Sequence, residues 1–170
     1  MSNALIIWAS SRPNGNTYKT VEAIKSHTDA EDLDISNANM SFFDYKENNL
    51  NDDFLKISQK LLDFKTIVFA TPVYWYSMCA QMKIFFDRTS DLLGPSKDIG
   101  QALKGKSTFL IANGTGEIIP EGFEIPFSLT SNYFDMNYKG AHYCHTGKNE
   151  TLKTNTWNKI ETFAERIKDA

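Results

Sequence analysis

Apolar residues along the chain alternate between short continuous runs and spaced, helix-like patterns. Residues 4–9 and 66–70 are nearly unbroken apolar runs, as expected of strands that are buried on both faces of a sheet. Residues 107–112 and 138–145 predict two further strands, and the alternation over 33–35 predicts a short strand near a sheet edge. The sequence therefore predicts five strands.

Helical spacing fills the gaps between these strands. Apolar side chains recur at intervals of three and four over residues 54–64, 80–93 and 157–167. Residues 17–28, with Val21 and Ile24 facing inward, and residues 127–134 predict two further helices. Strands that alternate with helices predict right-handed crossovers and a parallel sheet with helices on both faces. We therefore expect an α/β fold, with residues 1–170 forming one domain.

Composition and charge narrow the functional classes. The 170 residues are 41% hydrophobic and 23% charged, with a formal net charge of −3, which is typical of a globular chain. Lys and Arg are scattered and form no basic stripe, so we expect no nucleic-acid partner. The longest apolar run is far shorter than the ~20 residues that cross a bilayer, so we expect no membrane association and a cytoplasmic location.

The residues that commonly bind metals do not gather in the sequence. Cys79 and Cys144 are far apart, which favours two buried free thiols over a disulfide or a metal site. His142 and His145 flank Cys144, but alternation along a strand places residues 142 and 145 on opposite faces. We therefore expect no metal site, and a structural role for both histidines.

The loop after the first strand joins a buried strand to the start of a helix. Amide groups at a helix N-terminus attract anions, and polar side chains there could add donors around a phosphate. The candidates are Ser10, Arg12, Asn14, Gly15, Asn16 and Thr17. The loop has neither a G-x-G-x-x-G pattern nor a Walker A sequence, so it predicts neither a dinucleotide nor a nucleotide-triphosphate grip. An ordinary capped turn remains the alternative interpretation.

The loops after the third and fourth strands are the other candidates. Three consecutive aromatic residues follow the third strand, within Pro72, Val73, Tyr74, Trp75 and Tyr76. They could form the flat wall of a site for a planar ligand, or a hydrophobic plug over the end of the sheet. The fourth strand is followed by Asn113, Gly114, Thr115 and Gly116, where glycine permits a close backbone approach to a ligand. A flexible connection is the alternative there.

These loops carry a resemblance to a known family. Residues 10–17 and the stretch 71–83, continuing to 86–88, are similar to motifs of flavodoxin-like NAD(P)H-dependent FMN reductases and their quinone-reductase relatives. The resemblance implies a three-layer α/β/α sandwich with a parallel sheet of order 2-1-3-4-5. It also implies that the first loop holds the FMN phosphate, that residues 72–76 line the flavin ring, and that residues 113–117 meet the ring from the other side.

The chain departs from the family pattern in two places. Ala9 stands where the family usually has Gly, and Cys79 stands where it commonly has a small residue or Pro. Residues 36–52 contain no cysteine, which excludes the branch of the family that carries iron–sulfur clusters. The aromatic residues within the long loop 40–51 could cover a flavin, pack on a partner subunit, or form a surface excursion.

The function that we predict is an FMN-dependent oxidoreductase. It takes a hydride from NADPH or NADH and passes electrons to a small acceptor such as a quinone or free flavin, with no side chain required as an acid or base. The resembling family is generally dimeric, and helix 80–93 could retain exposed apolar surface, so we expect a homodimer. The alternatives are a flavodoxin-like electron carrier and a module that binds another phosphorylated ligand. The modest net charge and the Pro-Asn-Gly-Asn loop favour the reductase over the carrier.

Overall fold

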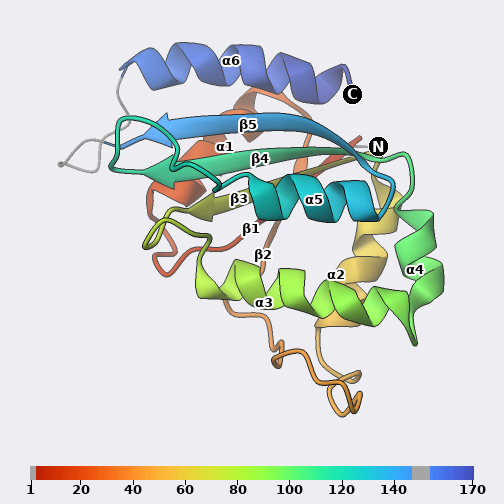
Figure 1. The fold of residues 1–170 in the computed structure, drawn as a ribbon. Helices are drawn as coiled ribbons and strands as arrows, with labels where there is room; N and C mark the ends of the chain where they lie inside the picture. The colour runs from red at the N-terminus through yellow and green to blue at the C-terminus, as the bar shows by residue number, and fades with distance from the viewer. Residues whose placement is uncertain (1–2, 147–153) are drawn as a thin grey trace.

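A parallel sheet of five strands forms the centre of the computed structural model, which describes residues 3–146 and 154–170. The strand order is β2-β1-β3-β4-β5, and every neighbouring pair is parallel (Figure 1). The strands are β1 (Ala4–Trp8), β2 (Glu31–Asp34), β3 (Thr66–Pro72), β4 (Ser107–Gly114) and β5 (Asn137–His145). The predicted parallel sheet and its order are confirmed, and this order is the flavodoxin-like one.

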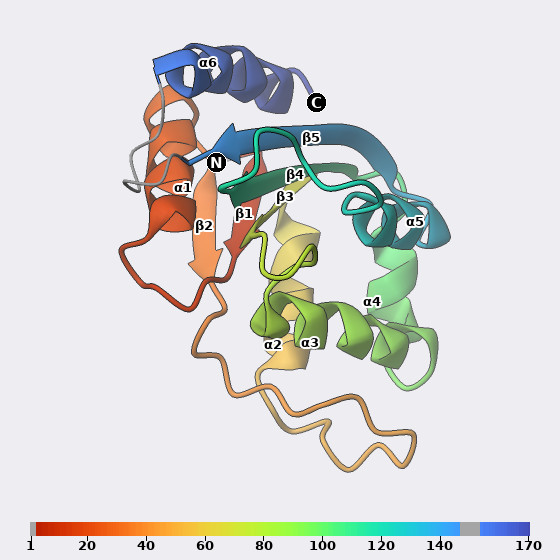
Figure 2. The same cartoon turned by 60° about the vertical axis from the view of Figure 1, so that its left-hand side comes forward.

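Helices cover both faces of the sheet. They are α1 (Asn16–His27), α2 (Phe54–Lys60), α3 (Ala80–Arg88), α4 (Lys97–Ala102), α5 (Ile125–Tyr133) and α6 (Thr154–Lys168), with 3-10 turns η1 (Leu61–Asp63) and η2 (Thr89–Leu93). Figure 2 shows α1 and α6 on one side of the sheet, with α2 and α3 on the other. The layers have the α/β/α order that the sequence predicts.

The alternation of side chains along β1 explains why the sheet needs both layers. Ile6 and Trp8 belong to the core beneath α1 and α6, whereas Leu5 and Ile7 belong to the core beneath α2, α3 and α5. All four side chains are buried, so neither face of this strand could be left in water. Burying such side chains contributes roughly 1.5–3 kcal/mol each.

The element bounds differ from the sequence-based ones in several places. Strand β2 spans Glu31–Asp34 instead of 33–35, and β3 ends two residues beyond its predicted end, at Pro72. Strand β4 likewise extends to Gly114, because Asn113 and Gly114 pair with Cys144 and His145 of β5. The predicted helix 80–93 changes from an α-helix to the 3-10 turn η2 at Thr89. The short helix α4 was not predicted, since its six residues carry no apolar stripe.

Arg88 fixes the long loop that contains residues 40–51. Its side chain is fully buried and donates to Asp91 at 2.7 Å, to Asp52, and to the carbonyl oxygen of Ser41 at 3.1 Å. Burial opposes the charge of Asp52, yet the hydrogen bond from Arg88 holds the pKa of this carboxyl below its ordinary value. The loop is therefore attached to α3, and both ribbon views show it projecting on the α3 side of the molecule.

Candidate functional site

Two adjoining clefts lie where strands β1, β3 and β4 end. The inner cleft has a volume of about 470 Å³, and the outer cleft about 600 Å³. The inner cleft is lined by Ser10, Arg12, Gly15, Asn16, Thr17, Pro72, Val73, Tyr74, Asn113, Gly114, Thr115 and Thr146. The outer cleft is lined by Val73, Trp75, Tyr76, Gly114, Thr115, Gly116, Ile118, Pro120, Glu121 and Tyr143. They share Val73, Gly114 and Thr115, so one elongated ligand could span both.

The loop from β1 brings the start of α1 to the inner cleft. The Ser10 amide donates to the hydroxyl of Ser36 at 3.0 Å, and the Arg12 amide donates to the hydroxyl of Ser10 at 3.2 Å. These bonds fix the part of the loop that precedes α1. The side chain of Thr17 is buried in the first turn of that helix. The first amides of a helix have no partner within it, and this first turn contains no acidic residue. The inner cleft therefore offers positive potential to an anion.

The aromatic segment after β3 forms a strained two-residue turn. The amide of Tyr74 donates to the carbonyl oxygen of Ser77 at 2.9 Å, and the amide of Ser77 donates back at 3.1 Å. Trp75 and Tyr76 between them have left-handed φ angles of 48° and 67°, as in a type I′ turn. Residues with bulky side chains adopt this conformation at a cost of about 1–2 kcal/mol each. Strain of this size commonly marks functional sites.

The turn displays its aromatic side chains. Trp75 is 93% exposed and Tyr76 is 76% exposed, so they do not form the hydrophobic plug that was the alternative interpretation of this segment. The segment after the turn is held to β3, because the Cys79 amide donates to the buried hydroxyl of Thr71 at 3.1 Å. Helix α3 begins at the next residue, Ala80. The exposed rings thus line the outer cleft on a rigid support.

The other side of the clefts is built from the end of β4. The carbonyl oxygen of Asn113 accepts the Val73 amide at 2.7 Å, which ties this strand end to the aromatic segment. A Cβ atom on Gly114 would lie 2.6 Å from the hydroxyl oxygen of Tyr143. That hydroxyl donates to the carbonyl oxygen of Gly116 at 2.9 Å. Glycine at position 114 therefore leaves the space in which the Tyr143 hydroxyl supports the loop beyond it.

Two amide oxygens of the inner cleft lack donors. The Oδ1 atoms of Asn16 and Asn113 are buried and accept no hydrogen bond from the part of the chain that the structure describes. The Nδ2 atom of Asn113 donates to the hydroxyl of Thr20 at 2.8 Å. A buried acceptor without a donor is costly, so both residues are suited to a ligand that carries hydroxyl groups.

The structure gathers nearly all the predicted site residues in one place. Every candidate from the three loops lines one of the two clefts except Asn14, which lines neither. Sequence reasoning missed Tyr143, Thr146, Ile118, Pro120 and Glu121. Tyr143 lies in β5 and Thr146 directly follows it. Both reach the clefts because β5 pairs with β4, and no local sequence motif encodes that pairing. Alternation along β5 does place Tyr143 on the opposite face from Cys144.

The histidine and cysteine of β5 face the core beneath α6. His142 is buried and stacks on Phe163, with ring centroids 5.0 Å apart. Burial, with the positive charges of Lys159 and Arg166, lowers the pKa of His142 to about 4, so the imidazole is neutral at pH 7. Burial likewise raises the pKa of the Cys144 thiol to about 12. Both groups are thus inert at neutral pH, in line with the predicted structural role of His142.

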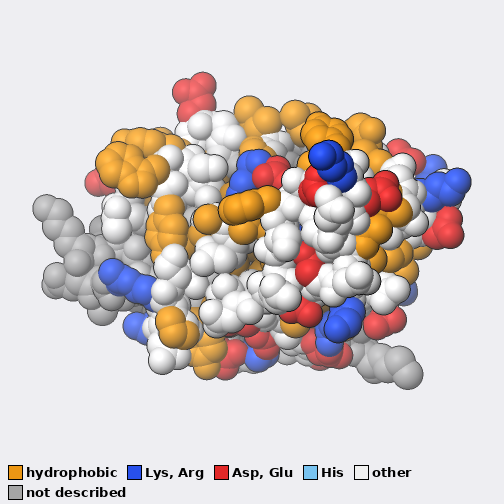
Figure 3. All heavy atoms as spheres, turned by 90° about the horizontal axis from the view of Figure 1, so that it is seen from below, with side chains coloured by type: hydrophobic (Ala, Val, Ile, Leu, Met, Phe, Trp, Pro, Cys, Tyr) orange, Lys and Arg blue, Asp and Glu red, His pale blue; other side chains and the backbone are white. Residues whose placement is uncertain are grey.

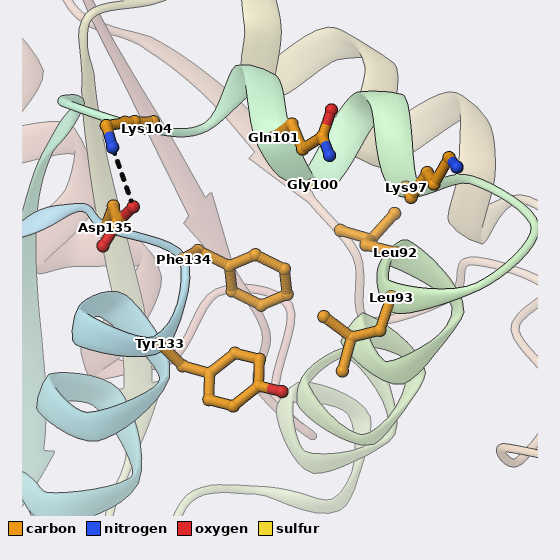
Figure 4. A pocket seen from close by; sticks show the side chains of 9 residues that line it. All are labelled: Leu92, Leu93, Lys97, Gly100, Gln101, Lys104, Tyr133, Phe134 and Asp135. Atoms are coloured by element: carbon orange, nitrogen blue, oxygen red, sulfur yellow. Dashed lines mark hydrogen bonds and ion pairs between the residues drawn. The ribbon is translucent and has the colours of Figure 1, made fainter.

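A third cavity lies at the opposite end of the sheet. It has a volume of about 400 Å³ and lies between η2, α4 and the end of α5. Figure 4 shows Leu92, Leu93, Tyr133 and Phe134 around it, with Lys104 paired to Asp135 at 3.0 Å. None of its lining side chains has a buried polar atom without a partner. Ligands of such sheets bind beyond the carboxyl ends of the strands, so the first two clefts are the candidate site.

Comparisons with known proteins agree with this geometry. A family model described as NADPH-dependent FMN reductase matches residues 2–118. The chain is 27% identical over 150 residues to the Bacillus subtilis protein YwqN, which is named as an NAD(P)H-dependent FMN-containing oxidoreductase. The aligned region covers 79% of this chain and 80% of YwqN. No helix among the described residues is long and apolar enough to span a membrane.

Solved structures share the fold. The Trp repressor binding protein from Bacillus subtilis has a TM-score of 0.72 at 23% identity, with 96% of each chain covered. An FMN-dependent NADH-azoreductase from Bacillus anthracis, solved in complex with FMN, has a TM-score of 0.70 at 11% identity, with 98% of this chain and 99% of that chain covered.

Proposed function

Since the chain belongs to the NADPH-dependent FMN reductase family, we propose that its two adjoining clefts hold one FMN and present it to a small electron acceptor. The chain is an FMN-dependent oxidoreductase with NAD(P)H as the reductant. The observation that carries the site assignment is the convergence of three loops, one with an anion-binding helix start, one with aromatic rings and one with glycines, at one end of the sheet.

The residues present fit FMN in both shape and hydrogen bonding. The cleft has orphaned acceptors in Asn16 and Asn113, which match the hydroxyls of a ribityl chain. The cleft wall is closely packed at its two glycines. A Cβ atom on Gly15 would lie 3.0 Å from Arg12 Cβ, and one on Gly114 would lie 2.6 Å from Tyr143 Oη, so larger residues there would displace side chains that line the clefts. The two clefts adjoin and have volumes of about 470 and 600 Å³, which gives room for a phosphate in one and a flat ring in the other.

Each part of the site has a distinct task in this proposal. The start of α1, with Arg12 and Thr17, holds the phosphate, because partial positive charge and unpaired amides favour an anion there. The turn that carries Trp75 and Tyr76 lies along one side of the ring. The segment from Gly114 to Gly116 meets the ring from the other side.

Held by these three loops, FMN would supply the redox chemistry, in which a hydride from NAD(P)H is taken up and the electrons are passed to the acceptor. The protein positions the reactants and stabilises charge. Val73 and Tyr74 donate their amides to Asn113 and Ser77, whereas the Trp75 and Tyr76 amides donate to no residue that the structure describes. These two amides are therefore the ones available to a negatively charged ring edge. We propose no side chain as a proton donor or acceptor.

We propose a quinone or free flavin as the acceptor. The outer cleft combines the rings of Trp75, Tyr76 and Tyr143 with the side chain of Ile118, and it is open to solvent beside Trp75. Flat aromatic molecules are the natural occupants of such a cleft. Steady-state oxidation of NADH or NADPH with menadione and with free FMN tests this proposal. A ping-pong pattern supports it, and turnover with neither acceptor contradicts it.

We also propose that the protein is a homodimer in the cytoplasm, with residues 1–170 as one FMN-binding domain. Large hydrophobic side chains are exposed on loop 40–51, on η2 and on α5, namely Phe42, Tyr45, Leu93, Leu129 and Tyr133. Figure 3 shows hydrophobic side chains interspersed with polar ones on the face seen from below. A second copy of the chain that covered these exposed side chains would remove them from water. The free thiols of Cys79 and Cys144 are typical of a reducing compartment. Light scattering of the FMN-loaded protein at micromolar concentration should give twice the mass of one chain.

A further inference from the structure

We propose that Asn113, held in one orientation by Thr20, is the residue that positions the ribityl chain of FMN. The inference rests on the proposed function and assigns a part of the ligand to a pair of residues in the wall of the inner cleft. Thr20 lies one turn into α1 and is fully buried, and Asn113 near the end of β4 is 4% exposed. The two side chains are far apart in the sequence but in contact in the fold.

The hydroxyl of Thr20 determines which way the Asn113 amide faces. A threonine hydroxyl has one proton, and Thr20 donates it to the backbone carbonyl oxygen of Asn16 at 2.9 Å. With that proton donated, its oxygen accepts the hydrogen bond that joins it to the NH2 group of Asn113, at 2.8 Å. The NH2 group of Asn113 therefore faces Thr20, and the Oδ1 atom is turned away from it.

The Oδ1 atom of Asn113 is consequently an acceptor that lacks a donor. It is buried, it receives no hydrogen bond from the described residues, and its residue lines the inner cleft. The Oδ1 atom of Asn16, in the same cleft, is in the same state. A phosphate dianion offers only acceptors and repels such oxygens, whereas a hydroxyl offers a proton. The oriented Asn113 amide therefore favours the polyol part of the ligand over its phosphate.

The position of Asn113 between the two ends of the site agrees with this role. On one side Thr20 links it to Asn16 at the first residue of α1, where the proposed phosphate site lies. On the other side its backbone oxygen accepts the amide of Val73, which begins the aromatic segment. Asn113 thus lies between the proposed phosphate end and the aromatic segment, in the wall of the inner cleft. A ribityl hydroxyl that donates to Oδ1 would satisfy this acceptor.

The experiment titrates unmodified and variant apoproteins with FMN, riboflavin and lumiflavin, following flavin fluorescence. Riboflavin lacks the phosphate, and lumiflavin lacks both the phosphate and the ribityl chain. Thr20→Val removes the hydroxyl without changing the size of the side chain, and Thr20→Ser retains the hydroxyl. Arg12→Ala is the matched variant at the phosphate end. Melting temperatures of the apoproteins show whether each variant folds.

Thr20→Val should weaken FMN and riboflavin by the same factor, about tenfold, and leave lumiflavin unchanged, while Thr20→Ser restores binding. Arg12→Ala should weaken FMN alone. Riboflavin should bind the unmodified protein more tightly than lumiflavin does, and undetectable lumiflavin binding also meets this expectation. Asn113→Ala should repeat the pattern of Thr20→Val.

Several results would overturn the inference. Equal affinities of the unmodified protein for riboflavin and lumiflavin would show that the ribityl chain is not recognised. Loss of FMN binding with riboflavin unaffected in Thr20→Val would place the effect at the phosphate loop. Equal loss in Thr20→Val and Thr20→Ser would show that the hydroxyl is not the cause. If the unmodified protein binds neither FMN nor riboflavin, the proposed function itself fails, which is a different outcome from normal FMN binding by Thr20→Val.

Discussion

Replacing Gly114 with alanine should damage the flavin site through its effect on Tyr143. The new methyl group would lie 2.6 Å from the Tyr143 hydroxyl oxygen and 3.3 Å from Val73 Cβ. Ordinary carbon contacts need about 3.5 Å, so the tip of the tyrosine must move by roughly 1 Å. That displacement breaks the 2.9 Å hydrogen bond from Tyr143 to the carbonyl oxygen of Gly116 and pushes the ring within the outer cleft.

The magnitude follows from these two effects. Loss of the hydrogen bond costs about 0.5–1.5 kcal/mol, and overpacking of a filled wall typically costs about 1–3 kcal/mol. Both are costs to the fold and should lower the free energy of unfolding. The displaced tyrosine and loop also line the FMN site, so Gly114→Ala should weaken FMN binding by about tenfold, or about 1.4 kcal/mol, as expected when one contact is disturbed. Gly116→Ala is a matched control in the same loop, because its Cβ would have its nearest neighbour at 3.5 Å, an ordinary contact.

Fluorescence titration of the apoproteins with FMN measures both affinities. Combining Gly114→Ala with Tyr143→Phe tests the cause, because the phenylalanine lacks the oxygen that the methyl group meets. The double variant should bind FMN better than the sum of the two single effects predicts. Normal affinity in Gly114→Ala, or an equal loss in Gly116→Ala, would refute the reasoning.

Three further predictions concern the phosphate end, the loop support and the dependence of stability on pH. Arg12→Ala and Thr17→Ala should each weaken FMN binding by roughly 1–3 kcal/mol in the same titration, and unchanged affinity in both would remove the phosphate from this loop. Arg88→Met should lower stability by about 3–5 kcal/mol in urea unfolding, because it leaves two buried carboxylates without their cation, and a loss below 1 kcal/mol would contradict this. Since the folded-state pKa of His142 lies below its unfolded value, its neutral form contributes stability that is full above pH 6.5 and falls by up to about 1.4 kcal/mol per pH unit towards pH 4. Urea unfolding at pH 7, 6 and 5 should show a smaller decrease for His142→Leu than for the unmodified protein, and equal decreases would contradict the burial argument.

The sheet and most helices could be predicted because their signals are local. The apolar runs of β1 and β3 must be buried on both faces, and the spaced apolar residues of α1 and α3 require one covered face each. Helix α4 carries no such signal. Its Gly100 is packed so closely that a Cβ would lie 2.4 Å from the carbonyl oxygen of Leu92, a contact that exists only in the folded chain.

The three loops of the candidate site could also be found from the sequence, but not their detailed geometry. Type I′ turns usually contain glycine or asparagine, so Trp75 and Tyr76 give no local indication of their left-handed φ angles. Tyr143 reaches the clefts through the register of β5 against β4, and Thr20 meets Asn113 through the packing of α1 on the sheet. These contacts depend on residues distant in the sequence, which periodicity and short motifs do not relate.

The account depends most directly on whether FMN at this site receives a hydride from a nicotinamide nucleotide without help from another protein. A nicotinamide must approach the flavin to about 3–3.5 Å between reacting atoms, which requires one accessible face of the ring. The outer cleft is open to solvent beside the exposed Trp75, which leaves room for a nicotinamide over one face of a ring bound there. The FMN-loaded protein should therefore lose its visible flavin absorbance when mixed anaerobically with NADH or NADPH, within the time of one turnover. Absorbance that persists with both nucleotides, but is lost when a separate reductase is added, would contradict the account and identify an electron carrier.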